Sequence, residues 1–171
     1  MILNDFVSSQ EFVEALLCLP LQELHLKWCK NLISLPECIG NFTSLTELDL
    51  SCCKSLKSLP ERIGDLTSLT KLNLWSCEKL VSLPQRFGEC KSLTSLGLSD
   101  CKSLVSLPED IGDLTSLTEL KLYNCESLVS LPKRFGELKS LKMLHVPDHM
   151  EDDKFPGDLR RVLEGQGCEI A

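Results

Sequence analysis

One stretch of 24 residues recurs along most of the chain. Residues 45–68 read LTELDLSCCKSLKSLPERIGDLTS, and near-copies begin at Leu69, Leu93 and Leu117. A divergent copy begins at Leu21 and a truncated one at Leu141. Self-similarity at a fixed period of this length is typical of a solenoid, in which one unit cannot bury its apolar side alone and stacked units share a core. The repeat therefore predicts a stack of similar coils.

Each part of the repeat can be read physically. Leu48 and Leu50 are two residues apart, so on a strand both side chains leave the same face while their neighbours leave the other. The Cys that follows has Leu three and six residues later, which returns apolar groups to the interior. Pro then stops the ladder, and the Ile-Gly or Phe-Gly pair predicts one helical or 3₁₀ turn closed by a glycine free to adopt positive φ.

The full pattern is L-x-x-L-x-L-x-x-C-x-x-L-x-x-L-P-x-x-I/F-G-x-L-x-S, and over about residues 21–146 it resembles the leucine-rich repeats of plant intracellular proteins. It is most similar to those of nucleotide-binding immune receptors of the Toll/interleukin-receptor type. The expected fold is an α/β leucine-rich repeat solenoid, or horseshoe, with a concave parallel β-sheet, convex turns and 3₁₀ helices, and helical caps at both ends. The fold hosts many binding roles, so the resemblance indicates function less directly.

Three segments are expected along the chain. Residues 1–20 form an N-terminal helical cap, residues 21–146 hold five complete repeats and one truncated repeat, and residues 147–171 form a C-terminal cap. In the last segment Asp158 is placed to cap a short helix that ends at Gly165, and residues 168–170 to add an edge strand. Solenoids need polar-faced ends of this kind to remain soluble.

Five of the ten cysteines recur at one repeat position: Cys29, Cys53, Cys77, Cys101 and Cys125. Neighbours in this ladder lie near the separation that a disulfide permits, so geometry alone leaves bridges open. Their equal spacing and parallel side-chain direction favour reduced core thiols, and hence a cytoplasmic or nuclear location. No apolar run approaches the length of a membrane span. The net charge of −7 argues against nucleic acid or an anionic membrane as partner.

The sequence holds no pattern typical of an enzyme. Phosphate-binding, nucleophile-elbow, zinc-protease and dinucleotide motifs are all missing. His25 and His145 share a repeat position at opposite ends of the sheet and cannot meet at one metal. His145, Asp148 and His149 could bind a metal only adventitiously. We therefore expect no catalytic activity, no cofactor and no metal.

The concave face carries the residues that differ between copies, whereas the apolar positions hardly change. The two tryptophans and the single tyrosine, Trp28, Trp75 and Tyr123, all map to this face. Exposed aromatics amid mixed charge are the usual composition of a binding hot spot. Ser95, Gly97 and Ser99 should leave the middle of the sheet flat, which favours a protein or peptide ligand over a small molecule. The candidate partner-binding residues are Trp28, Lys71, Asn73, Trp75, Glu119, Lys121 and Tyr123.

Three functional hypotheses follow. The first is a protein-interaction module, which the resemblance associates with ligand sensing or autoinhibition in plant-type innate immunity. The second is a structural or consensus-like scaffold without an evolved ligand, which the near-identity of the coils favours. The third is an accessory segment of a larger enzyme whose catalytic part lies elsewhere.

Overall fold

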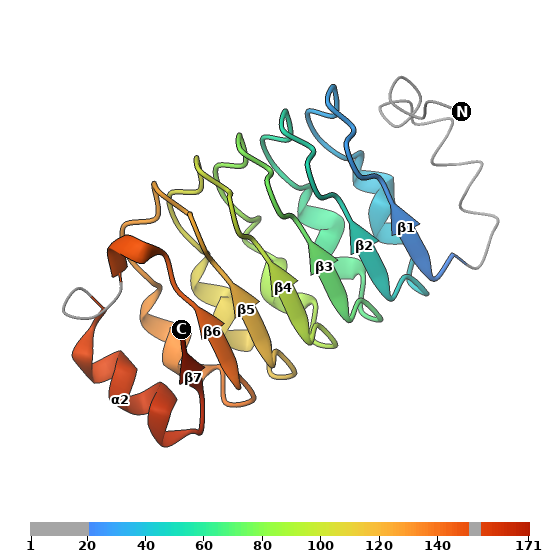
Figure 1. Ribbon diagram of the computed structural model, residues 1–171. Helices are drawn as coiled ribbons and strands as arrows, with labels where there is room; N and C mark the ends of the chain where they lie inside the picture. Colours follow the sequence, from blue (N-terminus) through green and yellow to red (C-terminus); the bar gives the residue numbers. More distant parts are fainter. Residues whose placement is uncertain (1–20, 151–154) are drawn as a thin grey trace.

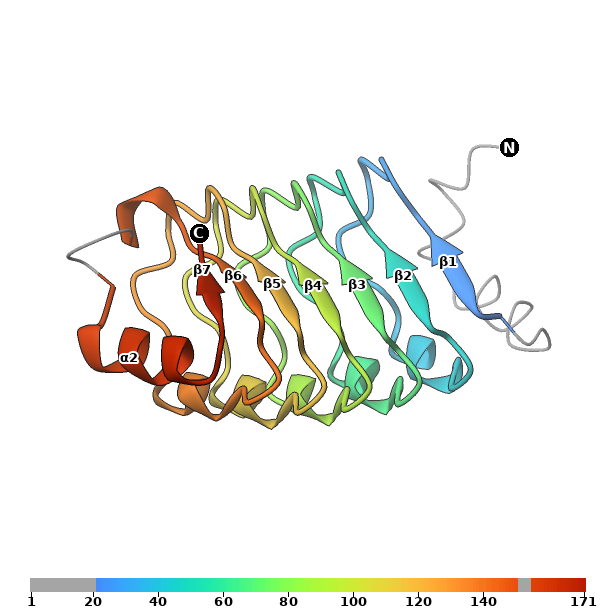
Figure 2. The same cartoon turned by 60° about the horizontal axis from the view of Figure 1, so that its bottom comes forward.

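Seven parallel strands form one open sheet along the stack of coils. The computed structural model describes residues 21–150 and 155–171. Figure 1 shows the strands side by side in sequence order, and Figure 2 shows that each returning segment runs behind the sheet. The strands are β1 (Glu23–His25), β2 (Glu47–Asp49), β3 (Lys71–Asn73), β4 (Ser95–Gly97), β5 (Glu119–Lys121), β6 (Met143–His145) and β7 (Glu169–Ile170).

The strands pair with a register of one whole repeat. Leu48 of β2 pairs with Leu24 of β1 on one side and with Leu72 of β3 on the other, and the same 24-residue offset holds through β6. Side chains at one repeat position therefore stand in a row across the sheet. The inward leucines of β2 to β6 make a core closed to solvent, as the repeat predicted. This core burial is the main favourable term for folding.

The convex side consists of short 3₁₀ helices, as expected. They are η2 (Glu37–Asn41), η3 (Glu61–Asp65), η4 (Phe87–Glu89), η5 (Glu109–Asp113) and η6 (Lys133–Glu137), followed by η7 (Asp148–Met150). In η2, η3, η5 and η6 an extended proline precedes the helix, because its fixed φ and missing N–H end the preceding extended segment. Each of η2 to η6 buries the Ile or Phe of the repeat against the core.

The glycine after that Ile or Phe has a different role from the one predicted. Gly167 is the one glycine with positive φ among the described residues, so the turn glycines do not need that conformation. They are needed for space. A Cβ on Gly40 would lie 2.5 Å from the carbonyl oxygen of Arg62, and one on Gly112 would lie 2.5 Å from that of Arg134. Each of the turns η2 to η5 thus packs closely against the backbone of the next coil.

The repeated cysteines are free and buried. All nine cysteines in the described residues are free thiols, and the five of the ladder lie in the core. Four of them donate a hydrogen bond to a leucine carbonyl of the preceding coil, as Cys53 Sγ does to Leu26 at 3.1 Å. Burial raises the pKa of the Cys53 and Cys125 thiols to about 12. The thiols therefore join coils as neutral donors.

A helix and a strand follow the last repeat. Helix α2 (Gly157–Gly165) packs on η6 and β7, and β7 pairs with β6. The predicted capping role of Asp158 is wrong, because Pro156 precedes the helix and no side chain caps it. The helix ends at Gly165, as predicted, and the residue with positive φ follows two positions later, at Gly167. The expected N-terminal cap, residues 1–20, lies outside the described residues.

We predict that Gly112→Ala lowers the free energy of unfolding by about 1–3 kcal/mol, the usual cost of overpacking a core. The added Cβ meets the Arg134 backbone, which cannot rotate away. Urea unfolding followed by circular dichroism measures the change. Gly165→Ala is the matched control, because its Cβ would meet nothing within 4 Å, and it should change stability by no more than about 1 kcal/mol. An equal loss in both variants would refute the close-approach explanation.

We also predict that the ladder thiols resist alkylation while the chain is folded. The thiolate is the reactive form, and burial raises the pKa of Cys77 and Cys101. With iodoacetamide near neutral pH, mass spectrometry should find the half-buried Cys38 modified in native protein, and Cys77 and Cys101 modified only in urea. Modification of the ladder at the rate of Cys38 would show that the core opens readily.

Candidate functional site

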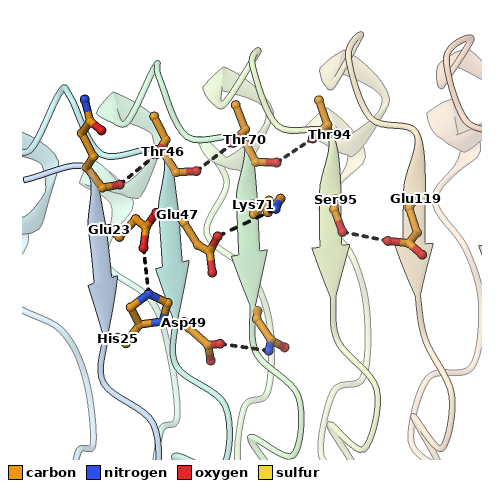
Figure 3. Close-up of polar contacts among 12 residues, drawn as sticks. Glu23, His25, Thr46, Glu47, Asp49, Thr70, Lys71, Thr94, Ser95 and Glu119 are labelled. Atoms are coloured by element: carbon orange, nitrogen blue, oxygen red, sulfur yellow. Dashed lines mark hydrogen bonds and ion pairs between the residues drawn. The ribbon is translucent and has the colours of Figure 1, made fainter.

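The concave face is a set of side-chain rows held at a fixed spacing. At the start of the strands a row of threonine hydroxyls joins successive coils. Thr70 Oγ1 donates to the Thr46 carbonyl at 2.9 Å, and Thr94 and Thr118 repeat the contact. Figure 3 shows this row above the polar side chains of the face. Because each hydroxyl binds the backbone of its neighbour, the strands present their outward side chains from a rigid base.

The three large aromatic side chains are exposed. Trp28, Trp75 and Tyr123 are 58%, 44% and 39% exposed. Trp75 Nε1 donates to Asp100 Oδ2 at 2.8 Å, across to the next coil. The Tyr123 hydroxyl lies 3.1 Å from His145 Nδ1, and the two ring centroids are 4.9 Å apart. Trp75 and Tyr123 are thus held by polar contacts while much of each ring faces solvent.

The rim position after each strand has a backbone conformation that the sequence analysis missed. Its five residues all have positive φ, from 53° to 63°: Trp28, Cys52, Ser76, Asp100 and Asn124. The first four donate their N–H to a carbonyl of the next coil, as Trp28 does to Ser51 at 2.9 Å. Apart from glycine, Asn and Asp tolerate this left-handed region best. Asn124 and Asp100 are therefore the residues from which the conformation could have been predicted. Trp28 is strained there and is directed outward.

A shallow hollow lies over β3 and β4. Its volume is about 230 Å³, and it is lined by Glu47, Asp49, Lys71, Leu72, Asn73, Ser95, Gly97 and Lys121. The prediction that the middle of the sheet is flat is therefore wrong. Ser95 and Gly97 are short, and longer side chains on the neighbouring strands stand above them. A Cβ on Gly97 would already lie 3.1 Å from Asn73 Oδ1.

Lysines and carboxylates alternate around this hollow. Lys121 Nζ lies 3.1 Å from Glu119 Oε1, and Ser95 Oγ donates to the other oxygen of Glu119 at 2.9 Å. Burial alone would raise the pKa of Glu119, but the hydrogen bonds from Lys121 and Ser95 outweigh it and hold the pKa below its usual value. Lys71 Nζ is 3.9 Å from Glu47 Oε2, too far for a hydrogen bond. Lys71 and Glu47 thus form a loose ion pair.

Asp49 and Ser51 lie on the concave side of the sheet, but both are buried. Only 4% of Asp49 is exposed, because Lys27 and Asn73 cover it. Burial alone would raise the pKa of Asp49. Hydrogen bonds from Ser51, Lys27 and Asn73 outweigh this effect, so the pKa lies below its ordinary value. The Asp49 carboxylate thus stabilises the surface between β1 and β3 through these contacts, and it does not present an unpaired charge.

Comparison with known proteins supports the fold. Residues 44–66 match the model of the Leucine Rich Repeat family. The structure is similar to a leucine-rich repeat protein of Leptospira interrogans, with 30% identity and a TM-score of 0.59, covering 92% of this chain and 44% of that one. It is also similar to the leucine-rich repeat domain of the type III effector XopL, with 30% identity and a TM-score of 0.56, covering 75% and 53%. The fold is a leucine-rich repeat solenoid.

The similarity covers only part of the known structures. The chain spans about half the length of each of these two similar structures. A search of curated protein sequences finds no significant match. In residues 21–150 and 155–171, no helix is long and apolar enough to cross a membrane. Leucine-rich repeat proteins as a class use their concave surfaces to bind protein ligands.

The solenoid brings six of the seven predicted site residues to two strands. Lys71, Asn73 and Trp75 belong to β3 and its extension, whereas Glu119, Lys121 and Tyr123 belong to β5 and its extension. They flank the small side chains of β4 on both sides. Trp28 lies apart, beyond β1. The predicted set omitted Glu47 and Asp49, which line the hollow, although their repeat positions placed them beside Lys71 and Asn73.

We predict that Asp49→Asn lowers the free energy of unfolding by about 1–3 kcal/mol at pH 7, the range for hydrogen bonds to a charged group. A carboxyl group whose pKa is lowered by folding stabilises the protein at pH values above its ordinary pKa, which is about 3.9. This stabilisation is lost as the pH falls through the folded-state pKa. The difference from wild type should therefore shrink as urea unfolding is repeated below about pH 4. Asp158→Asn, at a fully exposed side chain, is the control and should have little effect at either pH. A deficit that is independent of pH would contradict this account.

Proposed function

We propose that the chain is a protein-interaction module that binds a protein or peptide on the concave face over β3, β4 and β5. The observation that carries the proposal is the exposure of Trp28, Trp75 and Tyr123 on that face. Buried Leu, Ile and Phe account for most of the core, so these rings are not needed to fill it. Large exposed aromatics within a polar surround are typical of interaction hot spots.

Trp75 and Tyr123 are the proposed anchors, with Trp28 as a third contact farther along the face. The contacts with Asp100 and His145 hold the two anchor rings before a partner arrives, so little side-chain entropy is lost on binding. Lys71, Asn73, Glu119 and Lys121 would set the polarity of the partner. The partner would fit a segment of its own into the hollow above Ser95 and Gly97.

Other ligand classes fit this face less well. The hollow is shallow and bordered mainly by charged and polar side chains, whereas small-molecule sites are concave and mostly apolar. The net charge of −7 opposes nucleic acid and anionic membranes. We propose no catalytic activity and no cofactor for the interaction itself.

We further propose a role in ligand sensing or autoinhibition of the kind associated with plant-type immune receptors, in a cytoplasmic or nuclear setting. Two features support it: the L-P and Cys positions of the repeat, and the free state of the nine described cysteines. Residues 1–20 and 147–171 would close the two ends of the 21–146 repeat array. At the C-terminal end, the buried Leu163 of α2 and the pairing of β7 with β6 support this role.

One specific observation favours each of two other functions. The near-identity of the coils that begin at Leu45, Leu69, Leu93 and Leu117 suits a structural scaffold without an evolved ligand. The matches cover 44% and 53% of the two similar structures, which suits an accessory repeat segment of a larger enzyme. Binding that depends on Trp75 and Tyr123 would separate the interaction module from the scaffold.

We predict that Trp75→Ala combined with Tyr123→Ala reduces partner capture by at least about tenfold, because loss of two hot-spot side chains removes several kcal/mol of binding free energy. Quantitative mass spectrometry of proteins captured from native lysate measures the change. Val129→Ala is the control, since this exposed apolar residue lies outside the predicted site. Equal capture by wild type and the double variant would refute the proposal that Trp75 and Tyr123 anchor a partner on the concave face.

A further inference from the structure

Three potential metal ligands meet at the first two strands. His25, Glu47 and Asp49 each offer a ligand atom, and these atoms all lie within 4.8 Å of one another. His25 of β1 and Asp49 of β2 are register partners, and Glu47 stands two residues before Asp49 on the same face of the strand. No other such group of three occurs in residues 21–150 and 155–171, and His145, Asp148 and His149 do not form one.

The neighbours of this group orient it. Glu23 Oε2 lies 3.4 Å from His25 Nε2, which leaves Nδ1 of the ring for another partner. Figure 3 shows Glu23 contacting one edge of the imidazole while Asp49 lies beside the ring. The Ser51 N–H donates to Asp49 Oδ1 at 2.9 Å. Metal-bound histidines commonly have a carboxylate on the other ring nitrogen, which fixes the ring and raises its basicity as a ligand.

Two lysines compete for the carboxylates. Lys27 Nζ lies 3.0 Å from Asp49 Oδ2, and Lys71 Nζ lies 3.9 Å from Glu47 Oε2. Asn73 Nδ2 also reaches Asp49 Oδ2, at 3.3 Å. Both lysine side chains are about half exposed or more and are carried on flexible stems, so a divalent cation can displace their ammonium groups into water. The two carboxylates are thus paired with ammonium groups that a cation could replace.

We propose that His25, Glu47 and Asp49 form a binding site for a divalent transition-metal cation, with Zn²⁺ the best fit, and that Glu23 positions His25. One imidazole and two carboxylates suit zinc. Zinc bonds of about 2.0–2.2 Å require ligand atoms about 3.4 Å apart in a tetrahedron. The partly exposed His25 and Glu47 can close the remaining gap by side-chain rotation. The fourth position faces solvent on the concave side. This site does not depend on the proposed protein-binding role.

Calorimetric titration of the full chain with Zn²⁺, after N-ethylmaleimide has blocked accessible thiols, tests the proposal. We expect one site per chain. His25→Ala and Glu47→Gln should each weaken binding by at least about tenfold, and Glu23→Gln by about 10–100-fold, the usual effect of losing the partner of a ligating histidine. Lys27→Met should strengthen binding, because it removes the competing cation. His145→Ala is the matched control, since it stands at the same repeat position beside Lys121 rather than an aspartate, and it should bind like wild type.

Titration with Co²⁺ identifies the ligand atoms. Thiolate ligation gives an intense charge-transfer band in the near ultraviolet, whereas ligation by nitrogen and oxygen does not. We expect visible bands of Co²⁺ without the charge-transfer band, and their loss in His25→Ala. Circular dichroism of each variant confirms folding. The proposal is overturned by absence of Zn²⁺ binding in wild type, by equal binding in wild type and His25→Ala, or by the thiolate band.

Discussion

The stacking of each coil on the next is the interaction on which the rest of the structure depends. A single coil has only a three-residue strand and one 3₁₀ turn, neither of which could persist alone. The next coil supplies the partners: strand hydrogen bonds, the threonine row, the cysteine donors and the close approach of the turn glycines of η2 to η5 to a backbone carbonyl. The repeat period is therefore a structural requirement, because a shift of register would break all four contacts together.

This requirement separates the residues that hold the fold from those free to change. The leucines, the ladder cysteines and the turn glycines all face a neighbouring coil or the core. The outward positions of the strands contact mainly each other, so they can carry lysine, glycine or tryptophan without altering the stack. The concave face can thus acquire a hollow, three exposed aromatics and a His-Glu-Asp group within one framework. Those three features are where the chain differs from a uniform array.

The sequence predicted the framework well because the framework repeats. Four near-copies and one divergent copy of a single unit predicted the strands, the 3₁₀ turns and the buried cysteines without any tertiary information. The errors concern contacts between coils. The repeat pattern suggests that the glycine after Ile63 is needed for its backbone conformation. The structure shows that it is needed because the backbone of the next coil leaves no room for a Cβ. The middle of the sheet was expected to be flat because β4 was considered without the taller side chains beside it. The repeat positions show that His25 and the distant His145 cannot share a metal, but they do not draw attention to Asp49, the register partner of His25.

We propose that two sets of residues are separable: those of the stack support the fold, and those of the concave face bind a partner. Replacing Lys71, Asn73, Trp75, Glu119, Lys121 and Tyr123 together by serine tests it most directly, with the denaturant m-value and partner capture measured on the same protein. The account predicts a cooperative transition with an m-value like that of wild type, together with loss of capture. A broadened transition with a lower m-value, or capture that survives, would contradict it.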